Sequence, residues 1–259
     1  MLIRSVVRRL VPLRIRRPIG IGVYRAYRGT RNTLREGLGR LPLLATRDLV
    51  YDERFYKKGD PMKKEPYVRF VDALIGLRSP QSAVDVGCGS GIMLAEFVRR
   101  GISVRGVEGS RAAIARARLG DRIVRANLER GVPDLGRFDL CLCIEVAEHL
   151  STRSAPALVE GLTRLSDVVV FTAAQPGQRG TVHMNLQPKS YWRDLFATHN
   201  FDYGPLHDEL LAALADVPEP RYIHENLMVF ERVLEFETGS GDTAPGPNSV
   251  ALRPQSAEP

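Results

Sequence analysis

The segment that most constrains the fold is residues 83–100, where an apolar run enters a glycine-rich loop. The run AVDV leads into GCGSG, and the amphipathic stretch IMLAEFVRR follows at once. Glycines at such a loop let the backbone turn sharply and approach a ligand closely. A buried strand that passes through such a loop into a helix is typical of a strand-helix-strand unit in a parallel sheet. The segment therefore favours an α/β fold with a ligand site at the loop.

The rest of the chain alternates short β-branched runs with helical stretches, which predicts a doubly wound, mostly parallel sheet. We predict strands near residues 82–86, 103–107, 122–125, 138–144, 168–172 and 227–234. Helical patterns fall near residues 64–77, 91–100, 110–118, 153–165, 189–198 and 206–215. With 259 residues, of which 44% are hydrophobic, the chain can bury a substantial core. We expect a single domain over residues 51–237.

Two acidic residues end predicted strands beside the glycine loop. Asp85 can accept from an ammonium group, directly or through water. Glu108 lies nineteen residues after Gly89, and its carboxylate can accept from both hydroxyls of a ribose. The loop reads G-x-G-x-G instead of the dinucleotide pattern G-x-G-x-x-G, and no phosphate-binding lysine follows it. The pattern suits a ligand that carries an amino acid better than it suits a phosphate.

The motif VDVGCGSG resembles the first motif of class I S-adenosylmethionine-dependent methyltransferases, and the resemblance covers roughly residues 66–236. It implies a seven-stranded Rossmann-like sheet and S-adenosylmethionine as the cofactor. Asn127 stands where the family places an adenine-contacting residue, which is usually Asp. The structural alternatives are a tight turn for the loop, a helix cap for Glu108 and a small buried side chain for Cys88. The resemblance implies cofactor binding by Asp85, Gly87, Cys88, Gly89, Gly91, Glu108, Asn127 and Leu128.

A second group of polar residues follows the fourth predicted strand, in FDLCLCIEVAEHL at residues 138–150. Glu145, Glu148 and His149 fall at the carboxyl end of this strand, where open α/β sheets bind substrates. His183 lies in the loop after the next strand. Two carboxylates and two imidazoles can hold a divalent cation such as Mg²⁺, Mn²⁺ or Zn²⁺ and leave positions open for substrate oxygens. We therefore predict Glu145, Glu148, His149 and His183 as metal ligands.

The E-x-x-E-H pattern with a later histidine resembles metal-dependent O-methyltransferases, namely those of ubiquinone biosynthesis and those acting on the terminal ribose of small RNAs. The resemblance implies catalysis by Glu145, His149 and His183, with a cation that lowers the pKa of the attacking hydroxyl. Without a metal, His149 or His183 can act as the general base. A third alternative is a Glu-His pair that only caps a helix or shapes the pocket.

The N-terminal residues 1–50 form a basic arm, with twelve Arg against Glu36 and Asp48. The local balance is 12 − 2 = +10, so the remaining chain carries 7 − 10 = −3. Residues 2–11 place apolar side chains at helical spacing between arginines, so we expect the arm to be partly helical. It can lie on an anionic membrane surface, act as a targeting segment, or dock on its own domain.

Charge and composition indicate the chemical class of the methyl acceptor and the cellular compartment of the protein. The acidic balance outside the arm disfavours a nucleic-acid partner, and a small molecule or glycan fits better. Methyl transfer to an RNA ribose or to a quinone or lipid precursor is an alternative, and a non-catalytic cofactor-binding subunit is another. Three cysteines and the lack of a long apolar run predict a cytoplasmic protein, with peripheral membrane contact through the arm. Residues 238–259 have the composition of a disordered tail.

Overall fold

The computed structural model describes residues 48, 51–53, 65–178, 180–217 and 221–233. Its strands are β1 (Ser82–Val86), β2 (Ser103–Glu108), β3 (Ile123–Arg125), β4 (Leu140–Ile144), β5 (Val168–Thr172), β6 (Phe201–Tyr203) and β7 (Leu227–Arg232). Its α-helices are α5 (Glu65–Arg78), α6 (Ile92–Arg99), α7 (Arg111–Ala117), α8 (Ala155–Leu165), α9 (Lys189–Ala197), α10 (Pro205–Ala213) and α11 (Arg221–Glu225). Short 3-10 turns include η2 (Leu128–Arg130) and η3 (Ala147–His149).

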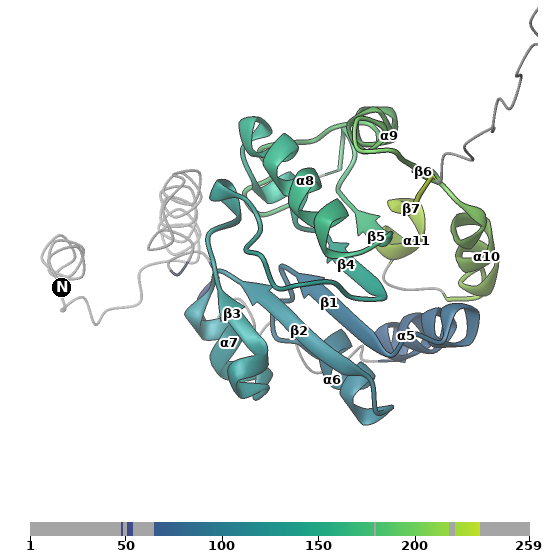
Figure 1. Ribbon diagram of the computed structural model, residues 1–259. Coiled ribbons are helices and arrows are strands. Elements are labelled where there is room, and N and C mark those ends of the chain that lie inside the picture. The colour runs from purple at the N-terminus through teal and green to yellow at the C-terminus, as the bar shows by residue number, and fades with distance from the viewer. Residues whose placement is uncertain (1–47, 49–50, 54–64, 179, 218–220, 234–259) are drawn as a thin grey trace, which may run out of the picture.

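The seven strands form one sheet in the order β3-β2-β1-β4-β5-β7-β6 (Figure 1). The pairs β1–β2, β1–β4, β2–β3 and β4–β5 are parallel, whereas β7 is antiparallel to both β5 and β6. The predicted doubly wound, mostly parallel sheet is confirmed. Strands β2 and β3 lie on one side of β1, and β4 and β5 lie on the other, so the strand order switches sides at β1. Ligands of open α/β sheets bind at such a switch point.

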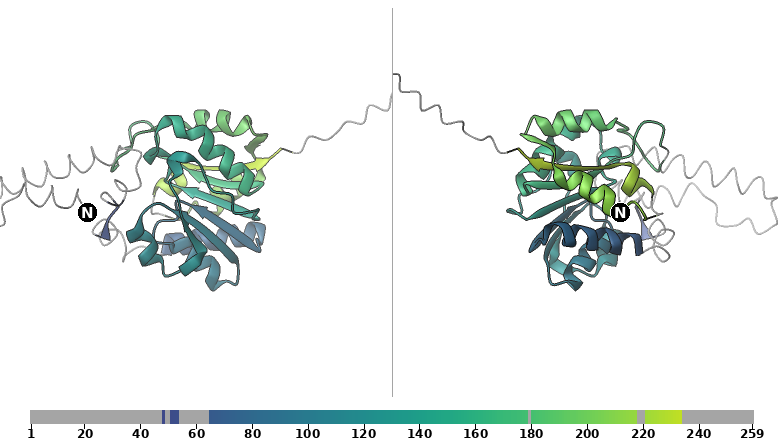
Figure 2. Two further views of the ribbon diagram at one scale, coloured as in Figure 1. Left: turned by 60° about the vertical axis from the view of Figure 1, so that its left-hand side comes forward. Right: turned by 90° about the vertical axis from the view of Figure 1, so that its right-hand side faces the viewer.

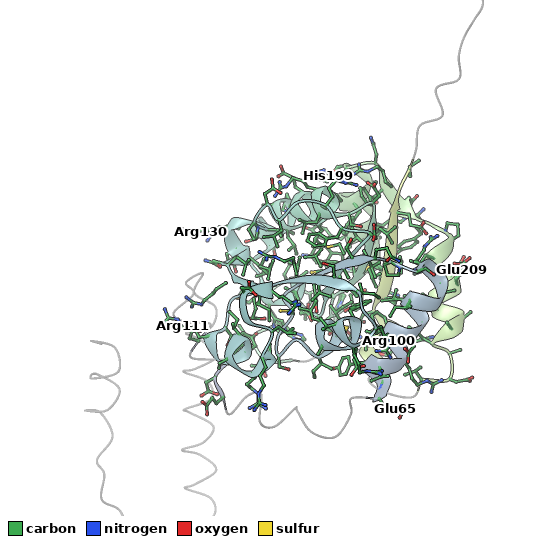
Figure 3. All side chains as sticks on the ribbon, turned by 60° about the horizontal axis from the view of Figure 1, so that its bottom comes forward. Glu65, Arg100, Arg111, Arg130, His199 and Glu209 are labelled. Atoms are coloured by element: carbon green, nitrogen blue, oxygen red, sulfur yellow. The ribbon has the colours of Figure 1, made fainter. Side chains whose placement is uncertain are left out.

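Alternating side chains of the sheet enter two separate hydrophobic cores. One core takes Val84, Cys141 and Phe171 under α8 and α9, and the other takes Ala83, Leu142 and Val170 under α5, α6 and α10. Because both faces are covered, these strands are apolar almost throughout, as expected for buried parallel strands. Figure 2 shows the sheet between its two helical layers. In Figure 3 the labelled side chains of Glu65, Arg111, Arg130, His199 and Glu209 lie along the outline of the molecule.

Most predicted elements match the observed ones within two or three residues, but two short elements were not predicted. Strand β6 has the sequence FDY and only three residues, too few to show an alternating pattern. Helix α11 is a five-residue segment after the Pro-rich loop. The predicted arm at residues 1–50 lies outside the described residues except for Asp48, and the predicted tail at 238–259 lies wholly outside them.

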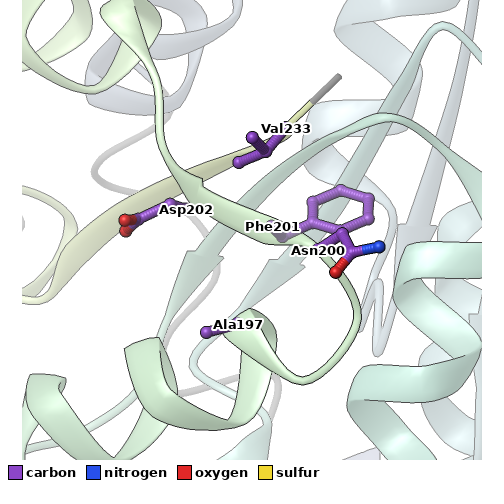
Figure 4. Close-up of a pocket in the computed structure, with 5 residues that line it drawn as sticks. All are labelled: Ala197, Asn200, Phe201, Asp202 and Val233. Carbon is purple, nitrogen blue, oxygen red and sulfur yellow. The ribbon is translucent and has the colours of Figure 1, made fainter. Parts of the chain in front are cut away.

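A shallow hollow at the outer edge of the sheet is lined by Ala197, Asn200, Phe201, Asp202 and Val233 (Figure 4). The pairings Val168↔Glu231 and Phe201↔Arg232 place it at the amino ends of the parallel strands. The hollow therefore lies at the amino ends of the strands, whereas the glycine loop lies at their carboxyl ends. Among the described residues, none of the helices is both long enough and apolar enough to cross a membrane.

The aromatic cluster around Phe171 generates a stability prediction. Its fully buried ring packs 5.0 Å from Trp192, 5.5 Å from Phe196 and 6.5 Å from Phe230 between ring centroids. We expect Phe171→Ala to lower the free energy of unfolding by about 3–5 kcal/mol, because it leaves a cavity between packed rings. Urea denaturation measures this. Val233→Ala, at a side chain that is 52% exposed, should change it by less than about 0.5 kcal/mol. Similar effects in the two variants would contradict the packing described here.

Candidate active site

The glycine loop after β1 adopts a backbone that side chains would strain or block. Gly87, Gly89 and Gly91 have φ angles of 84°, 55° and 70°. A Cβ added to Gly87 would lie 2.3 Å from Val146 Cγ2, so the loop packs directly on the segment that follows β4. The backbone N–H of Gly87 donates to the Val107 carbonyl at 2.7 Å, which ties the loop to β2. The loop is thus held between the ends of β2 and β4.

Asp85, the second-to-last residue of β1, is a buried carboxylate without a donor among the described residues. It is 1% exposed, and neither carboxylate oxygen accepts a hydrogen bond from the described residues. Burial, and then the nearby Glu108 carboxylate, raise the pKa of Asp85 to about 7. Leaving a buried carboxylate unsatisfied is costly, so the side chain is suited to an incoming cationic or hydrogen-bond-donating group.

Glu108, at the end of β2, is fixed by two backbone donors. Gly89 N–H donates to Oε2 at 2.8 Å, and Ser110 N–H donates to Oε1 at 2.7 Å. A carboxylate oxygen can accept more than one hydrogen bond, so the group can still receive two hydroxyls. The same contacts join the glycine loop to the start of α7. Glu108 therefore supports the loop and presents a fixed carboxylate, while the helix cap itself is Ser110.

Three further residues expected at the cofactor lie differently. Cys88 is buried, and a Cβ on Gly106 would lie 2.9 Å from its Sγ. Burial, and then the Asp85 carboxylate, raise the pKa of the Cys88 thiol, which stays neutral. The Leu128 side chain packs in the core. The Asn127 amide oxygen accepts from the Glu129 N–H at 3.2 Å and caps η2. Cys88 thus offers its backbone to a ligand, and its side chain packs in the core.

A second buried carboxylate, Glu148, lies beyond the end of β4. It has no exposed surface, and neither oxygen accepts a hydrogen bond from the described residues. Burial, and then the Glu145 carboxylate, raise the pKa of Glu148 to about 9. Ligand atoms of Glu148, His149 and His183 all lie within 4.8 Å of one another. His149 Nε2 is 3.9 Å from Glu148 Oε1, and the two imidazole rings are 4.9 Å apart between centroids.

Glu145 stands beside this cluster without joining it. Its backbone has a φ of 55°, held by N–H donation to Thr172 Oγ1 at 2.9 Å. Its carboxylate accepts from Asn226 Nδ2 at 3.0 Å. The structure thus brings three of the four predicted metal ligands within reach of one point, and it places Glu145 as an acidic neighbour that is already hydrogen-bonded. The four-ligand site stays a prediction, for which the structure places three of the four residues close together.

Several polar residues around the cluster were not singled out from the sequence. Asn226, just before β7, donates to both Glu145 and Gln178. The Asn185 N–H donates to the Glu148 carbonyl at 3.1 Å, which docks the loop after β5. Tyr51 Oη lies 3.1 Å from His149 Nδ1. None carries a motif, because each reaches the site by a contact between segments far apart in the sequence.

Part of this chain matches a known protein family. Residues 84–166, which span β1 to the end of α8, match the family model described as a methyltransferase domain. Residues 84–166 are thus similar to a methyltransferase domain, and the fold is that of class I S-adenosylmethionine-dependent methyltransferases.

Particular relatives narrow the comparison. The chain is 29% identical over 143 residues to a ubiquinone biosynthesis O-methyltransferase from Alkalilimnicola ehrlichii, covering 52% of this chain and 53% of that protein. It thus spans about half the length of the curated relatives it matches. The fold is similar to that of an S-adenosylmethionine-bound amino pentose methyltransferase from Micromonospora echinaspora, with a TM-score of 0.52 and 18% sequence identity. That match covers 70% of this chain and 96% of the other. The fold is also similar to that of a sugar N-methyltransferase from Streptoalloteichus, with a TM-score of 0.51 and 19% sequence identity. That match covers 69% of this chain and 92% of the other.

The raised pKa of Asp85 predicts pH-dependent binding of S-adenosylhomocysteine. If Asp85 pairs with the ligand's ammonium group, it must lose its proton on binding, so affinity should be flat above about pH 7 and fall by up to about tenfold per unit below it. Calorimetric titration across this range measures the slope. In Asp85→Asn, which cannot ionise, affinity should be weaker and its pH dependence smaller. An equal slope in both proteins would show that Asp85 does not titrate on binding.

Proposed function

We propose that this chain transfers a methyl group from S-adenosylmethionine to a hydroxyl of a small molecule or glycan. The observation that carries the proposal is a pair of buried carboxylates without hydrogen-bond donors, Asp85 and Glu148, at the same edge of the sheet. Asp85 lies near the end of β1, and Glu148 lies just after the neighbouring strand β4. One suits the amino-acid end of the cofactor, and the other lies among histidines that can handle an acceptor proton.

The cofactor side of this proposal uses the end of β1 and the end of β2. Asp85 pairs with the ammonium group, and Glu108, already oriented by Gly89 and Ser110, accepts from the ribose hydroxyls. Gly87, Gly89 and Gly91 allow close approach of the backbone. Asn127 and Leu128 follow β3 and would offer their backbone to the adenine, because the Leu128 side chain packs in the core and the Asn127 side chain caps η2; Cys88 likewise contributes its backbone.

The acceptor side uses the residues after β4 and β5. The cofactor supplies an electrophilic methyl group, so the protein's task is to remove the acceptor proton and align its oxygen. His149 or His183 takes this proton, since neutral imidazole accepts protons near physiological pH. Glu145, held by Asn226, adds negative charge beside them and stabilises a protonated imidazole.

The same residues fit a divalent cation. Glu148 is buried with both oxygens lacking donors, and the Nδ1 atom of His183 also lacks a partner among the described residues. A carboxylate with two imidazoles suits Mn²⁺ or Zn²⁺, and Mg²⁺ less well. Glu148, His149 and His183 would hold the ion, with Glu145 next to them. A bound ion would lower the pKa of an acceptor hydroxyl. Such metal assistance is part of our proposal.

The acceptor class rests on charge and on relatives. The chain outside residues 1–50 has a net charge of −3, which favours a glycan or small hydroxylated molecule over RNA ribose. A quinone or lipid precursor is the second candidate, because relatives are ubiquinone biosynthesis O-methyltransferases. Peripheral contact of the basic arm with a membrane, from a cytoplasmic location, would suit that candidate.

We expect Glu108→Ala to weaken S-adenosylhomocysteine binding by about tenfold or more. The variant loses one or two charge-assisted hydrogen bonds of about 1.5–3 kcal/mol each. Calorimetry on the full chain measures it, and circular dichroism checks the fold, because Glu108 also supports the loop. Glu209→Ala on α10, at an exposed carboxylate, is the matched control and should bind as the wild type does. Equal affinity in all three proteins would contradict the assigned cofactor site.

Methyl transfer itself tests the acceptor side. With radiolabelled cofactor, catechol and methyl glucoside as hydroxyl probes, and methyl glucosaminide as an amine probe, we expect label on oxygen. His183→Ala should abolish transfer and leave cofactor affinity within twofold. Label only on the amine would contradict O-methylation. A protein that binds cofactor but labels neither these probes nor small molecules extracted from its source cells would support a non-catalytic subunit.

The metal is tested by an uncharged isostere. If a cation is needed, Glu148→Gln and strong chelator should each abolish transfer, and Mn²⁺ or Zn²⁺ should restore the chelated wild type. The matched control is Glu160→Gln, an exposed residue of α8. Full activity of Glu148→Gln in chelator, with no metal found by elemental analysis, would leave an imidazole as a simple general base.

A further inference from the structure

We propose that Tyr51, from the segment that precedes α5, covers the cofactor loop with its ring and positions His149 with its hydroxyl. This inference rests on the proposed function and extends it to a residue outside the matched family region, which begins at residue 84. It arises from two contacts of Tyr51 that reach opposite sides of the site.

The backbone of Tyr51 is held on the cofactor side. Its carbonyl accepts from Ser110 Oγ at 2.7 Å. Ser110 also donates its N–H to Glu108 Oε1 at 2.7 Å, and its Oγ accepts from Ala113 N–H at 3.2 Å as the N-cap of α7. Ser110 is itself 1% exposed. The anchor of Tyr51 is therefore a buried residue that also orients the proposed ribose-binding carboxylate.

Asp48 adds a second anchor on the same side. Its Oδ1 accepts from the Arg111 N–H at 2.9 Å, at the first residue of α7, and its Oδ2 lies 3.1 Å from Arg125 Nη2 at the end of β3. A carboxylate at a helix N-terminus is favourable, because it meets free N–H groups and the positive end of the helix dipole. Two described residues three positions apart are thus tied to the ends of β2 and β3.

The side chain of Tyr51 reaches the acceptor side. Its Oη lies 3.1 Å from His149 Nδ1, and its ring is edge-on to the imidazole with centroids 5.8 Å apart. Ser110 follows β2 and His149 follows β4, and β1 lies between these strands. Tyr51 therefore spans the carboxyl end of β1, where the glycine loop begins. A ligand seated on that loop would have the ring of Tyr51 over it.

The contacts at Nδ1 also select a tautomer of His149. The Val182 carbonyl lies 3.4 Å from Nδ1, and a carbonyl can only accept, so Nδ1 carries the proton. The Tyr51 oxygen shares this proton as a second acceptor. The lone pair is then on Nε2, the atom 3.9 Å from Glu148 Oε1, where it can take a proton or bind a cation. Tyr51 acts on the acceptor through His149, and so it is a positioning residue.

Two variants of the full chain separate the two roles. Tyr51→Phe keeps the ring and loses the hydroxyl, whereas Tyr51→Ala loses both. We expect Tyr51→Ala to weaken S-adenosylhomocysteine binding by about tenfold and Tyr51→Phe to bind within twofold of the wild type. Tyr203→Phe on β6, at the far edge of the sheet, is the matched control.

The positioning role is read by nitrogen NMR of the histidine rings on chelator-treated protein, at alkaline pH where imidazole is neutral, with His149→Gln for assignment. The wild type should show His149 with a protonated Nδ1. Tyr51→Phe should keep this tautomer, because the Val182 carbonyl still accepts from Nδ1, but should shift the Nδ1 resonance, because the proton loses its second acceptor. With whichever probe acceptor the wild type methylates, Tyr51→Phe should lower kcat at least fivefold and leave the acceptor KM within twofold.

Two results would overturn the inference: wild-type affinity in Tyr51→Ala, or an unchanged His149 spectrum in Tyr51→Phe. Neither readout needs a methylated product. If the wild type failed to bind S-adenosylhomocysteine at all, the proposed function would fail, while the spectrum would still decide whether Tyr51 positions His149.

Discussion

The structure depends on how it tolerates two carboxylates in its interior. Asp85 and Glu148 are almost completely buried, and neither accepts a hydrogen bond from the described residues. Such burial lowers the free energy of unfolding, because the cost of desolvating a carboxylate is offset only by a hydrogen-bond donor or a positive charge. Both lie at one edge of the sheet, where such partners arrive as ligands. The rest of the fold holds these two groups in place.

The scaffold does this by fixing the backbone around each group. Parallel pairing of β1 with β2 and β4 brings three strand ends together, and the apolar cores on both faces prevent the strands from shifting. Gly87 lets the loop pack on Val146, which joins the cofactor side to the segment that carries Glu148. Backbone donation from Met184 and Asn185 to the Glu148 carbonyl brings His183 alongside. The two halves of the site are thus parts of one packed unit.

Sequence reasoning recovered the elements that repeat a physical pattern. The apolar runs that became β1, β2, β4 and β5 and the motif around Gly87 were readable because each is local. Strand β6 was missed because FDY is too short to show alternation. The roles of Tyr51 and Asn226 could not be read, because their contacts span 98 and 81 residues. The separation of Glu145 from the three-residue cluster likewise depends on its φ of 55°, which no residue pattern predicted.

A crystal structure of the full chain with S-adenosylhomocysteine tests the central claim most directly. The account predicts ribose hydroxyls on the Glu108 carboxylate, the ammonium group within direct or water-mediated reach of Asp85, and the sulfur directed toward Glu148, His149 and His183. A ligand bound away from the loop at residues 87–91, or one whose sulfur pointed away from the histidines, would contradict it.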